Sequence, residues 1–160
     1  LSIGVVSKAY GLPGLRVGWI ACKDLNILKQ LEQQKHYLSI CNSAPSEILA
    51  LIALRNIDKI IKRNKQIVQS NLKLLDAFFI KNKNILEWVR PTGGCTGFVK
   101  IKLNMSADEF CKQLRDSKGV LILPSSLYDC KDAYFRIGFG RKNMPEALEK
   151  LQEFLNEINQ

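Results

Sequence analysis

The sequence predicts an α/β protein that changes to an α+β pattern after a long helix. Two short apolar runs near the start, residues 1–7 and 15–22, have the β-branched composition of strands. Apolar residues then recur at helical spacing from Ile57 to Phe79. Beyond residue 85, short runs of alternating polarity are interspersed with segments that carry helix-capping residues. This order of elements is typical of a sheet with helices packed against it.

The composition is that of a folded protein. The chain has 160 residues, of which 46% are hydrophobic, and this is sufficient for one compact domain or two small ones. No apolar run reaches the roughly 18 residues of a membrane span, and no basic-then-apolar leader opens the chain. We therefore expect a cytoplasmic protein without a membrane partner.

The cysteines and the single histidine do not form a metal-binding pattern. The five cysteines are widely scattered and contain no C-x-x-C pair, so neither a disulfide framework nor a zinc site is indicated. His36 has no partner cysteine or carboxylate at ligand spacing. We expect reduced thiols and no metal ion.

The net charge of +9 would suit a polyanionic partner such as nucleic acid. The lysines, however, are spread along the expected helices, without a basic block and without interleaved aromatic residues. This distribution favours a solvated surface over a nucleic-acid interface.

The first two strands flank a segment rich in glycine and proline. The run 1–7 has the composition of a strand buried on both faces, and Lys8 follows at its end. The second run, 15–22, carries Arg16 near its beginning. Regular structure between them is interrupted by Gly11, Pro13, Gly14 and Gly18. Residues at such strand ends often form active sites in α/β sheets.

Lys8 and Arg16 have complementary chemistry. A lysine amine attacks a carbonyl only in its neutral form, so a carbonyl-binding lysine must be partly desolvated or lie near other cations. Arg16 is such a cation, and its planar guanidinium suits a phosphate dianion through paired hydrogen bonds. The Lys8 and Arg16 segment therefore predicts a site for a ligand with a carbonyl and a phosphate.

Helices follow the second strand. Asp24 can cap a helix that extends to about Leu38, and the turn at 42–45 precedes an apolar segment, 46–54. Because residues 46–54 are apolar nearly all round, we expect this second helix to be buried. The third helix begins near Ile57 and ends before the loop at 81–84.

The sequence after residue 85 predicts three strands, with a helix between the second and the third. Strands are expected at 87–90, 97–102 and 120–123, and a capping box of Ser106 and Glu109 begins a helix that ends near Ser117.

The segment 133–139 alternates regularly and is followed by the last helix. Its spacing places Phe135, Ile137 and Phe139 on one face and Arg136 on the other. Asn143 then has the character of a helix cap, with the apolar stripe of the helix formed by Leu148, Leu151, Leu155 and Ile158.

Two motifs carry a family resemblance. Residues 7–19, which read SKAYGLPGLRVGW, resemble the lysine segment of the class I/II aminotransferases, fold-type-I enzymes that depend on pyridoxal 5′-phosphate. Residues 135–141, FRIGFGR, resemble the C-terminal motif of the same family. The resemblance extends from Leu1 to about Leu155.

The resemblance implies roles for individual residues. Lys8 would carry the cofactor as a Schiff base and act as the catalytic acid and base, and Arg16 would bind the cofactor phosphate. Many relatives have a serine or threonine where this chain has Val5, so one phosphate contact is either missing or supplied by Ser7 instead. Arg136 would bind the α-carboxylate of an amino-acid substrate, whereas Arg141 is expected to be exposed to solvent.

The resemblance also implies a domain organisation. Residues 1–70 would be the C-terminal remnant of a large cofactor-binding domain, with the end of its sheet, and residues 71–160 a small α+β domain, the two joined by the long helix. The parent protein would be a homodimer that transfers an amino group between an amino acid and a 2-oxo acid, and the chain alone is expected to be inactive or nearly so.

Three alternatives remain open at this stage. The same fold hosts other reactions that depend on pyridoxal 5′-phosphate, such as those of lyases, decarboxylases and synthases. The chain could also be a truncated module without catalysis. A transcriptional regulator built on this fold is the third alternative, and the scattered basic residues disfavour it.

Overall fold

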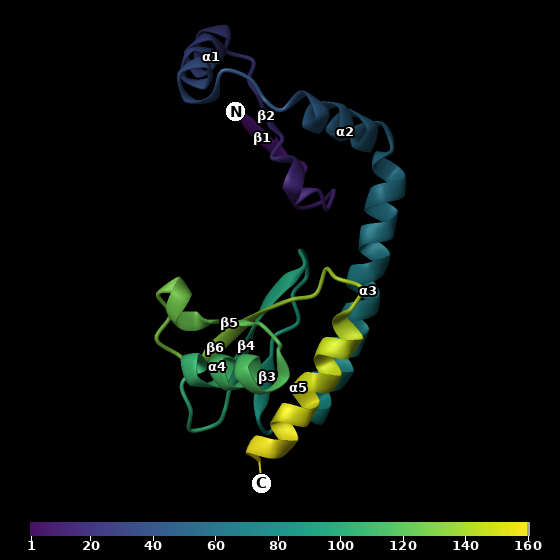
Figure 1. The fold of residues 1–160 in the computed structure, drawn as a ribbon, viewed down its shortest axis with the longest axis vertical. Helices are drawn as coiled ribbons and strands as arrows, with labels where there is room; N and C mark the ends of the chain where they lie inside the picture. The colour runs from purple at the N-terminus through teal and green to yellow at the C-terminus, as the bar shows by residue number, and fades with distance from the viewer. Residues whose placement is uncertain (160) are drawn as a thin grey trace. The chain divides into compact units, whose positions relative to one another are not determined.

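The computed structural model of the protein describes residues 1–159, and the chain forms two compact units, Leu1–Lys65 and Gln66–Gln160. Each unit contains its own β-sheet (Figure 1). The helix α3, Ile57–Lys81, is continuous across the division and has the bounds that the apolar spacing predicts. None of the helices in residues 1–159 combines the length and the apolarity needed to cross a membrane.

The sheet of the first unit is a hairpin. Strand β1, Ser2–Val5, pairs antiparallel with β2, Gly18–Ala21, and the loop between them contains a short 3-10 turn, Pro13–Leu15. Both strands were expected from the sequence and both are shorter than expected. The prediction that the first strand is buried on both faces is wrong: Ile3, for example, is 74% exposed. Among the described residues β1 pairs only with β2, and nearly every residue of the two strands is exposed.

Two helices follow the hairpin. Helix α1, Leu25–Ser39, begins at Asp24, whose carboxylate accepts hydrogen bonds from the backbone N–H groups of Asn26 and Ile27 at 2.9 and 3.3 Å, as the capping prediction requires.

Helix α2, Ala44–Arg55, was predicted to be buried, and this is wrong. Of its residues only Ala50 and Ala53 are buried. The helix is apolar on every side, whereas the described part of the first unit covers only the side that carries these alanines. The large apolar side chains that remain exposed are Ile48, Leu49, Leu51, Ile52 and Leu54.

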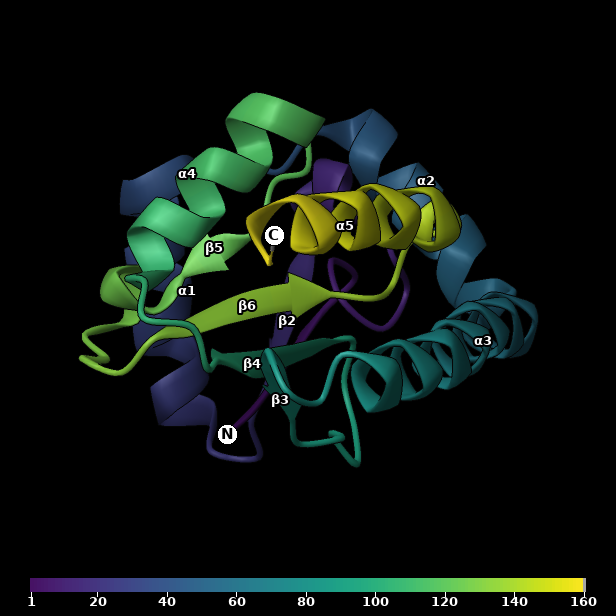
Figure 2. The ribbon, with the colours of Figure 1, turned by 90° about the horizontal axis from the view of Figure 1, so that it is seen from below.

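The second unit is a four-stranded antiparallel sheet with helices packed on it (Figure 2). The order of the strands is β3-β4-β6-β5, and the elements are β3 (Leu86–Trp88), β4 (Thr96–Ile101), α4 (Ala107–Lys118), β5 (Leu123–Pro124), β6 (Tyr134–Gly138) and α5 (Met144–Ile158). The strand expected at 120–123 forms only at its end, because only Leu123 and Pro124 pair with β6. The other expected strands and helices of this half are present within a few residues.

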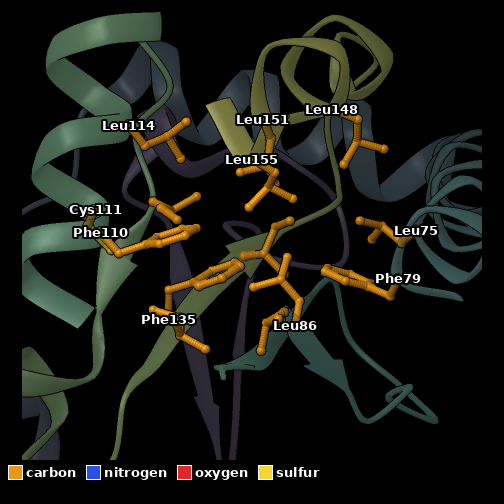
Figure 3. Close-up of a cluster of buried hydrophobic side chains, with 14 of the residues drawn as sticks. Leu75, Phe79, Leu86, Phe110, Cys111, Leu114, Phe135, Leu148, Leu151 and Leu155 are labelled. Carbon is orange, nitrogen blue, oxygen red and sulfur yellow. The ribbon is translucent and has the colours of Figure 1, made fainter. Parts of the chain in front are cut away.

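The core of the second unit lies on one face of this sheet. Figure 3 shows side chains of α3, α4 and α5 converging on those of β3 and β6. The predicted alternation is confirmed, since Phe135, Ile137 and Phe139 are at most 5% exposed. The rings of Phe110 and Phe135 stack at 5.5 Å between centroids. Beside them, burial raises the pKa of the Cys111 thiol to about 12, with a smaller contribution from Asp108.

Two helix caps differ in part from the prediction. The Ser106 hydroxyl accepts a hydrogen bond from the Glu109 N–H at 3.2 Å, but the Glu109 carboxylate accepts from Gln113 instead of returning to the cap. Only half of the capping box therefore forms. Asn143 precedes α5 as expected but makes no side-chain cap, because its backbone (φ −84°, ψ 19°) is not extended.

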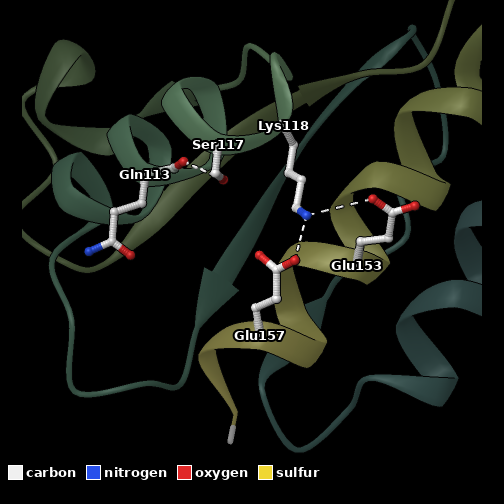
Figure 4. A network of polar contacts seen from close by, with 5 residues as sticks. All are labelled: Gln113, Ser117, Lys118, Glu153 and Glu157. Atoms are coloured by element: carbon white, nitrogen blue, oxygen red, sulfur yellow. Dashed lines mark hydrogen bonds and ion pairs between the residues drawn. The ribbon is translucent and has the colours of Figure 1, made fainter.

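A polar network joins the end of α4 to α5 (Figure 4). The Lys118 ammonium contacts Glu157 at 2.5 Å and Glu153 at 3.7 Å, and the hydrogen bond to Glu157 raises the pKa of Lys118. Surface ion pairs of this kind contribute little to stability, so the apolar contacts account for most of the packing of α4 on α5.

The core packing gives a stability prediction. Phe135→Ala is expected to lower the free energy of unfolding by about 3–5 kcal/mol, because the phenylalanine is fully buried and its removal leaves a cavity. Urea denaturation monitored by the fluorescence of Trp88 measures this, in a Trp19→Phe background so that Trp88 is the single tryptophan. The control is Ile80→Ala, whose side chain is 71% exposed. Equal effects of the two substitutions would contradict the core described here.

Candidate functional site

The loop between β1 and β2 places Lys8 and Arg16 at the same end of the hairpin. The Val6 N–H donates to the Val17 carbonyl at 3.2 Å and so extends the pairing of the strands by one step. The loop then closes on itself, because the Leu12 N–H donates to the Val6 carbonyl at 3.1 Å. Lys8 lies two residues after Val6, and Arg16 lies directly before Val17, the residue that pairs with Val6. Both residues are therefore at the loop end of the hairpin.

Arg16 has an unusual backbone conformation. Its φ of 54° lies in the left-handed region, where it terminates the 3-10 turn, and its Nη1 donates to the Pro13 carbonyl at 3.0 Å. Such a conformation in a residue other than glycine is unfavourable and is often found at functional sites. The turn also contains Gly14, which is exposed, and a Cβ placed there would have no atom within 4 Å.

The charge at this loop is positive and uncompensated. Lys8 and Arg16 are exposed and Ser7 is half-buried. Among residues 1–159, neither cation is within ion-pair distance of a carboxylate. Two cations and a hydroxyl on one loop are a suitable set for an anionic ligand with a carbonyl, as the sequence predicted.

Asn64 holds this loop and was missed by the sequence reasoning. Its side-chain amide, on α3, donates to the Ala9 carbonyl at 2.9 Å. The residue after Tyr10 is Gly11, with φ 68°, and a Cβ there would approach the Asn64 amide to 3.4 Å. Asn64 therefore fixes the backbone immediately after Lys8. A polar residue on an amphipathic helix carries no sequence signal for this role.

Arg136 lies in the second unit, in the middle of β6. It pairs with Phe98 of β4 on one side and with Leu123 of β5 on the other. Its half-buried side chain points away from the core, as the alternation predicted, and its Nη1 donates to the Tyr128 hydroxyl at 2.6 Å. Tyr128 is a second contact that the sequence did not reveal.

Arg136 lines a cavity of about 590 Å³. Arg141 also lines it and is exposed, in agreement with the prediction. The remaining wall is formed by the segment 119–123 and by the beginning of α5. The cavity is large enough for a small molecule such as an amino acid.

The backbone that follows Arg136 is fixed by Asn71. This asparagine of α3 is 4% exposed, and its amide donates to the carbonyls of Phe139 and Arg141 at 2.9 and 2.7 Å. An amide within the buried stripe of Leu72 and Leu75 is the one sequence signal that could have identified it. Asn71 thus anchors the segment between β6 and α5.

A family model, a curated protein and a solved structure each match nearly the whole chain. Residues 1–151 match the family described as "Aminotransferase class I and II". The capreomycidine synthase of Streptomyces vinaceus is 29% identical over 157 residues, an alignment that covers 97% of this chain and 40% of the synthase. The crystal structure of a PLP-dependent aminotransferase from Streptococcus suis 89-1591 superposes with a TM-score of 0.87 and 34% identity, covering 97% of this chain and 41% of that chain.

A relative of another kind is also found. The HTH-type transcriptional regulator NorG of Staphylococcus aureus (strain USA300) is 23% identical over 155 residues, which cover 91% of this chain and 34% of the regulator. The chain thus spans between about a third and two fifths of the length of these relatives.

Proposed function

The chain belongs to the aminotransferase class I and II family, and from this membership we propose that it is the C-terminal part of an enzyme that transfers an amino group between an amino acid and a 2-oxo acid. The family and the fold-type-I architecture were both predicted from residues 7–19 and 135–141, and both are confirmed. The observation that supports the proposal best is the placement of Lys8 and Arg16 at one closed end of the β1–β2 hairpin.

The residues present suit the cofactor that the family implies, pyridoxal 5′-phosphate. The Lys8 amine would bind its aldehyde carbon, the Arg16 guanidinium would pair with its phosphate, and the Ser7 hydroxyl would add a hydrogen bond. The positive charge of Lys8 and Arg16, which have no ion-pair partner among residues 1–159, supports this assignment. When bound, the cofactor supplies the electron sink that makes the Cα proton of an amino acid acidic.

The chain's own residues would then perform two tasks. Lys8 would move the proton to and from the substrate Cα as a general base and acid. Arg136 would hold the substrate α-carboxylate with two parallel hydrogen bonds and so fix the direction of the Cα–H bond. Its position on the uncovered side of β6, at the wall of the 590 Å³ cavity, favours this role.

The domain assignment remains part of the proposal. We assign residues 1–70 to a large cofactor-binding domain and residues 71–160 to a small domain of a cytoplasmic homodimer. The exposed apolar side chains of α2 and of the β1–β2 hairpin are consistent with a chain that packs against further residues of a longer protein. On this account the 160 residues alone are inactive, because the remaining contacts to the cofactor lie outside them.

Two of the relatives support other functions. The similarity to capreomycidine synthase favours a synthase reaction, and the similarity to NorG favours a transcriptional regulator. The sequence upstream of this chain in its gene distinguishes an enzyme of either reaction type from a regulator and from a truncated module. A cofactor-domain segment supports an enzyme, a DNA-binding domain a regulator, and a stop codon a truncated module.

The visible absorbance of the protein with added pyridoxal 5′-phosphate tests the proposal. The longer protein is expected to form a coloured, stoichiometric complex, whereas the 160-residue chain binds the cofactor weakly because Lys8 is exposed to water. A tight, coloured complex of the 160-residue chain would contradict the dependence on further residues. A longer protein that stays colourless would contradict the cofactor assignment itself.

A further inference from the structure

Only one nitrogen of the Arg136 guanidinium, Nη1, makes a hydrogen bond among residues 1–159. Its Nη1 donates to the Tyr128 hydroxyl at 2.6 Å, and its Cζ lies 5.8 Å from the centroid of the Tyr128 ring. No hydrogen bond of its Nε or Nη2 to another residue is found within 1–159, and no carboxylate pairs with it there. A guanidinium can bind a carboxylate through either of two edges, Nε with Nη2 or Nη1 with Nη2. The bond to Tyr128 uses Nη1, which belongs only to the second edge, and leaves both nitrogens of the first edge available.

Tyr128 is well placed to hold this orientation because its loop is anchored to the sheet. It ends the short 3-10 turn Ser125–Tyr128, which follows β5 directly. Ser125 is 2% exposed, and its hydroxyl donates to the Asp132 carbonyl at 2.5 Å and accepts from the Tyr134 N–H at 3.3 Å. The turn is therefore fixed to the strand that carries Arg136.

The ring of Tyr128 is also fixed by packing. It meets the ring of Phe98 edge to face, with 5.4 Å between the centroids and 80° between the planes. Phe98 is the direct cross-strand partner of Arg136. Phe98, Tyr128 and Arg136 thus form one contiguous cluster on the side of the sheet opposite the core, in which each side chain restricts the next.

We propose that Tyr128 is a positioning residue that orients Arg136 for a carboxylate, so that the substrate binds through the Nε/Nη2 edge. This inference rests on the proposed function of Arg136. A long, flexible arginine loses conformational entropy when it binds a ligand, and a contact that fixes it beforehand reduces that cost. The hydroxyl of Tyr128 acts here as the acceptor, and its ring lies beside the guanidinium.

The experiment compares Tyr128→Phe with a matched control in the longer protein. The control is Tyr134→Phe, which also removes a tyrosine hydroxyl from this sheet. The ring of Tyr134 lies under Lys100 rather than beside Arg136. The probe ligand is 13C-labelled acetate, whose binding is followed by its line width, with Arg136→Lys as the reference for loss of the site. Nitrogen-15 NMR of the arginine side chains reports independently whether rotation of the Arg136 guanidinium is restricted.

The expected results distinguish the proposed function of Arg136 from the positioning role of Tyr128. Arg136→Lys is expected to weaken acetate binding strongly, Tyr128→Phe to weaken it about tenfold, and Tyr134→Phe to leave it unchanged. In Tyr128→Phe alone, the separate Nη signals of Arg136 should merge as rotation becomes faster. If Arg136→Lys binds acetate like the wild type, the proposed function of Arg136 fails. If Arg136→Lys loses binding but Tyr128→Phe retains it, or if the Nη signals are unaffected, the positioning role of Tyr128 is overturned.

Discussion

Replacement of Lys8 by alanine in the longer protein is expected to lower kcat by about 10⁴-fold, because a positioned general acid and base alone contributes about 10²–10⁴. The same substitution also removes the amine that would bind the cofactor aldehyde. The rate of conversion of a panel of amino acids with a fixed 2-oxo acid measures the effect. Added methylamine should restore part of the lost rate, since it supplies a free amine in place of the side chain.

The control for this prediction is Lys23→Ala. Lys23 is also an exposed lysine of the first unit, just beyond the end of β2, and its removal should leave kcat within about twofold. A Lys8→Ala variant that retains a tenth or more of the wild-type rate would show that another group carries the proton.

The second large effect is expected at Arg136. Arg136→Ala should lower kcat/KM for amino acids by about 30-fold to a few thousand-fold, since loss of one partner of a buried, hydrogen-bonded charge pair costs about 2–5 kcal/mol. Arg136→Lys should also be impaired, because an ammonium cannot form the two parallel hydrogen bonds of a guanidinium. Binding of the cofactor should not change.

The deciding comparison is between an α-amino acid and the corresponding amine without a carboxylate. Arg136→Ala should lower kcat/KM for the amino acid and leave kcat/KM for the amine nearly unchanged. Arg115→Ala is the control, because Arg115 is exposed on α4 and its side chain pairs with Asp116 alone among residues 1–159. If the substitution at Arg136 affects both substrates equally, or neither, then Arg136 is a structural residue of the strand and the carboxylate is bound elsewhere.

The second unit was largely predictable because its signals are local and its core is complete. The alternation at 133–139 places Phe135 in the core and Arg136 on the other side, and the spacing of Ile57 to Phe79 gives one long helix. For Phe135, and for α3 from Val68 onward, the residues that cover the predicted face lie within the second unit.

The burial of the first unit could not be predicted, since burial depends on what covers a face. Helix α2 has the sequence of a buried helix, yet most of its large side chains are exposed in this chain. The contacts of Asn64, Asn71 and Tyr128 were also missed. Each is a single hydrogen bond or pair of bonds between residues far apart in sequence or in an irregular loop, and only Asn71, a polar residue within an apolar stripe, leaves a signal in the sequence.

The site residues were identified from motifs rather than from physical patterns. Lys8 and Arg16 were singled out by the segment 7–19, and the hairpin explains how residues eight positions apart reach the same end of two strands. The left-handed backbone of Arg16 was not foreseen, because only the closed turn before it imposes that conformation.

Borohydride reduction of the longer protein with pyridoxal 5′-phosphate, followed by peptide mapping, tests the central claim most directly. Reduction makes the bond between the cofactor and an amine permanent, so the modified peptide identifies the lysine. We predict a single stoichiometric adduct on Lys8, in the peptide that contains residues 7–19. An adduct on another lysine, such as Lys23, or no adduct at all, would contradict the assignment of this loop as the cofactor site.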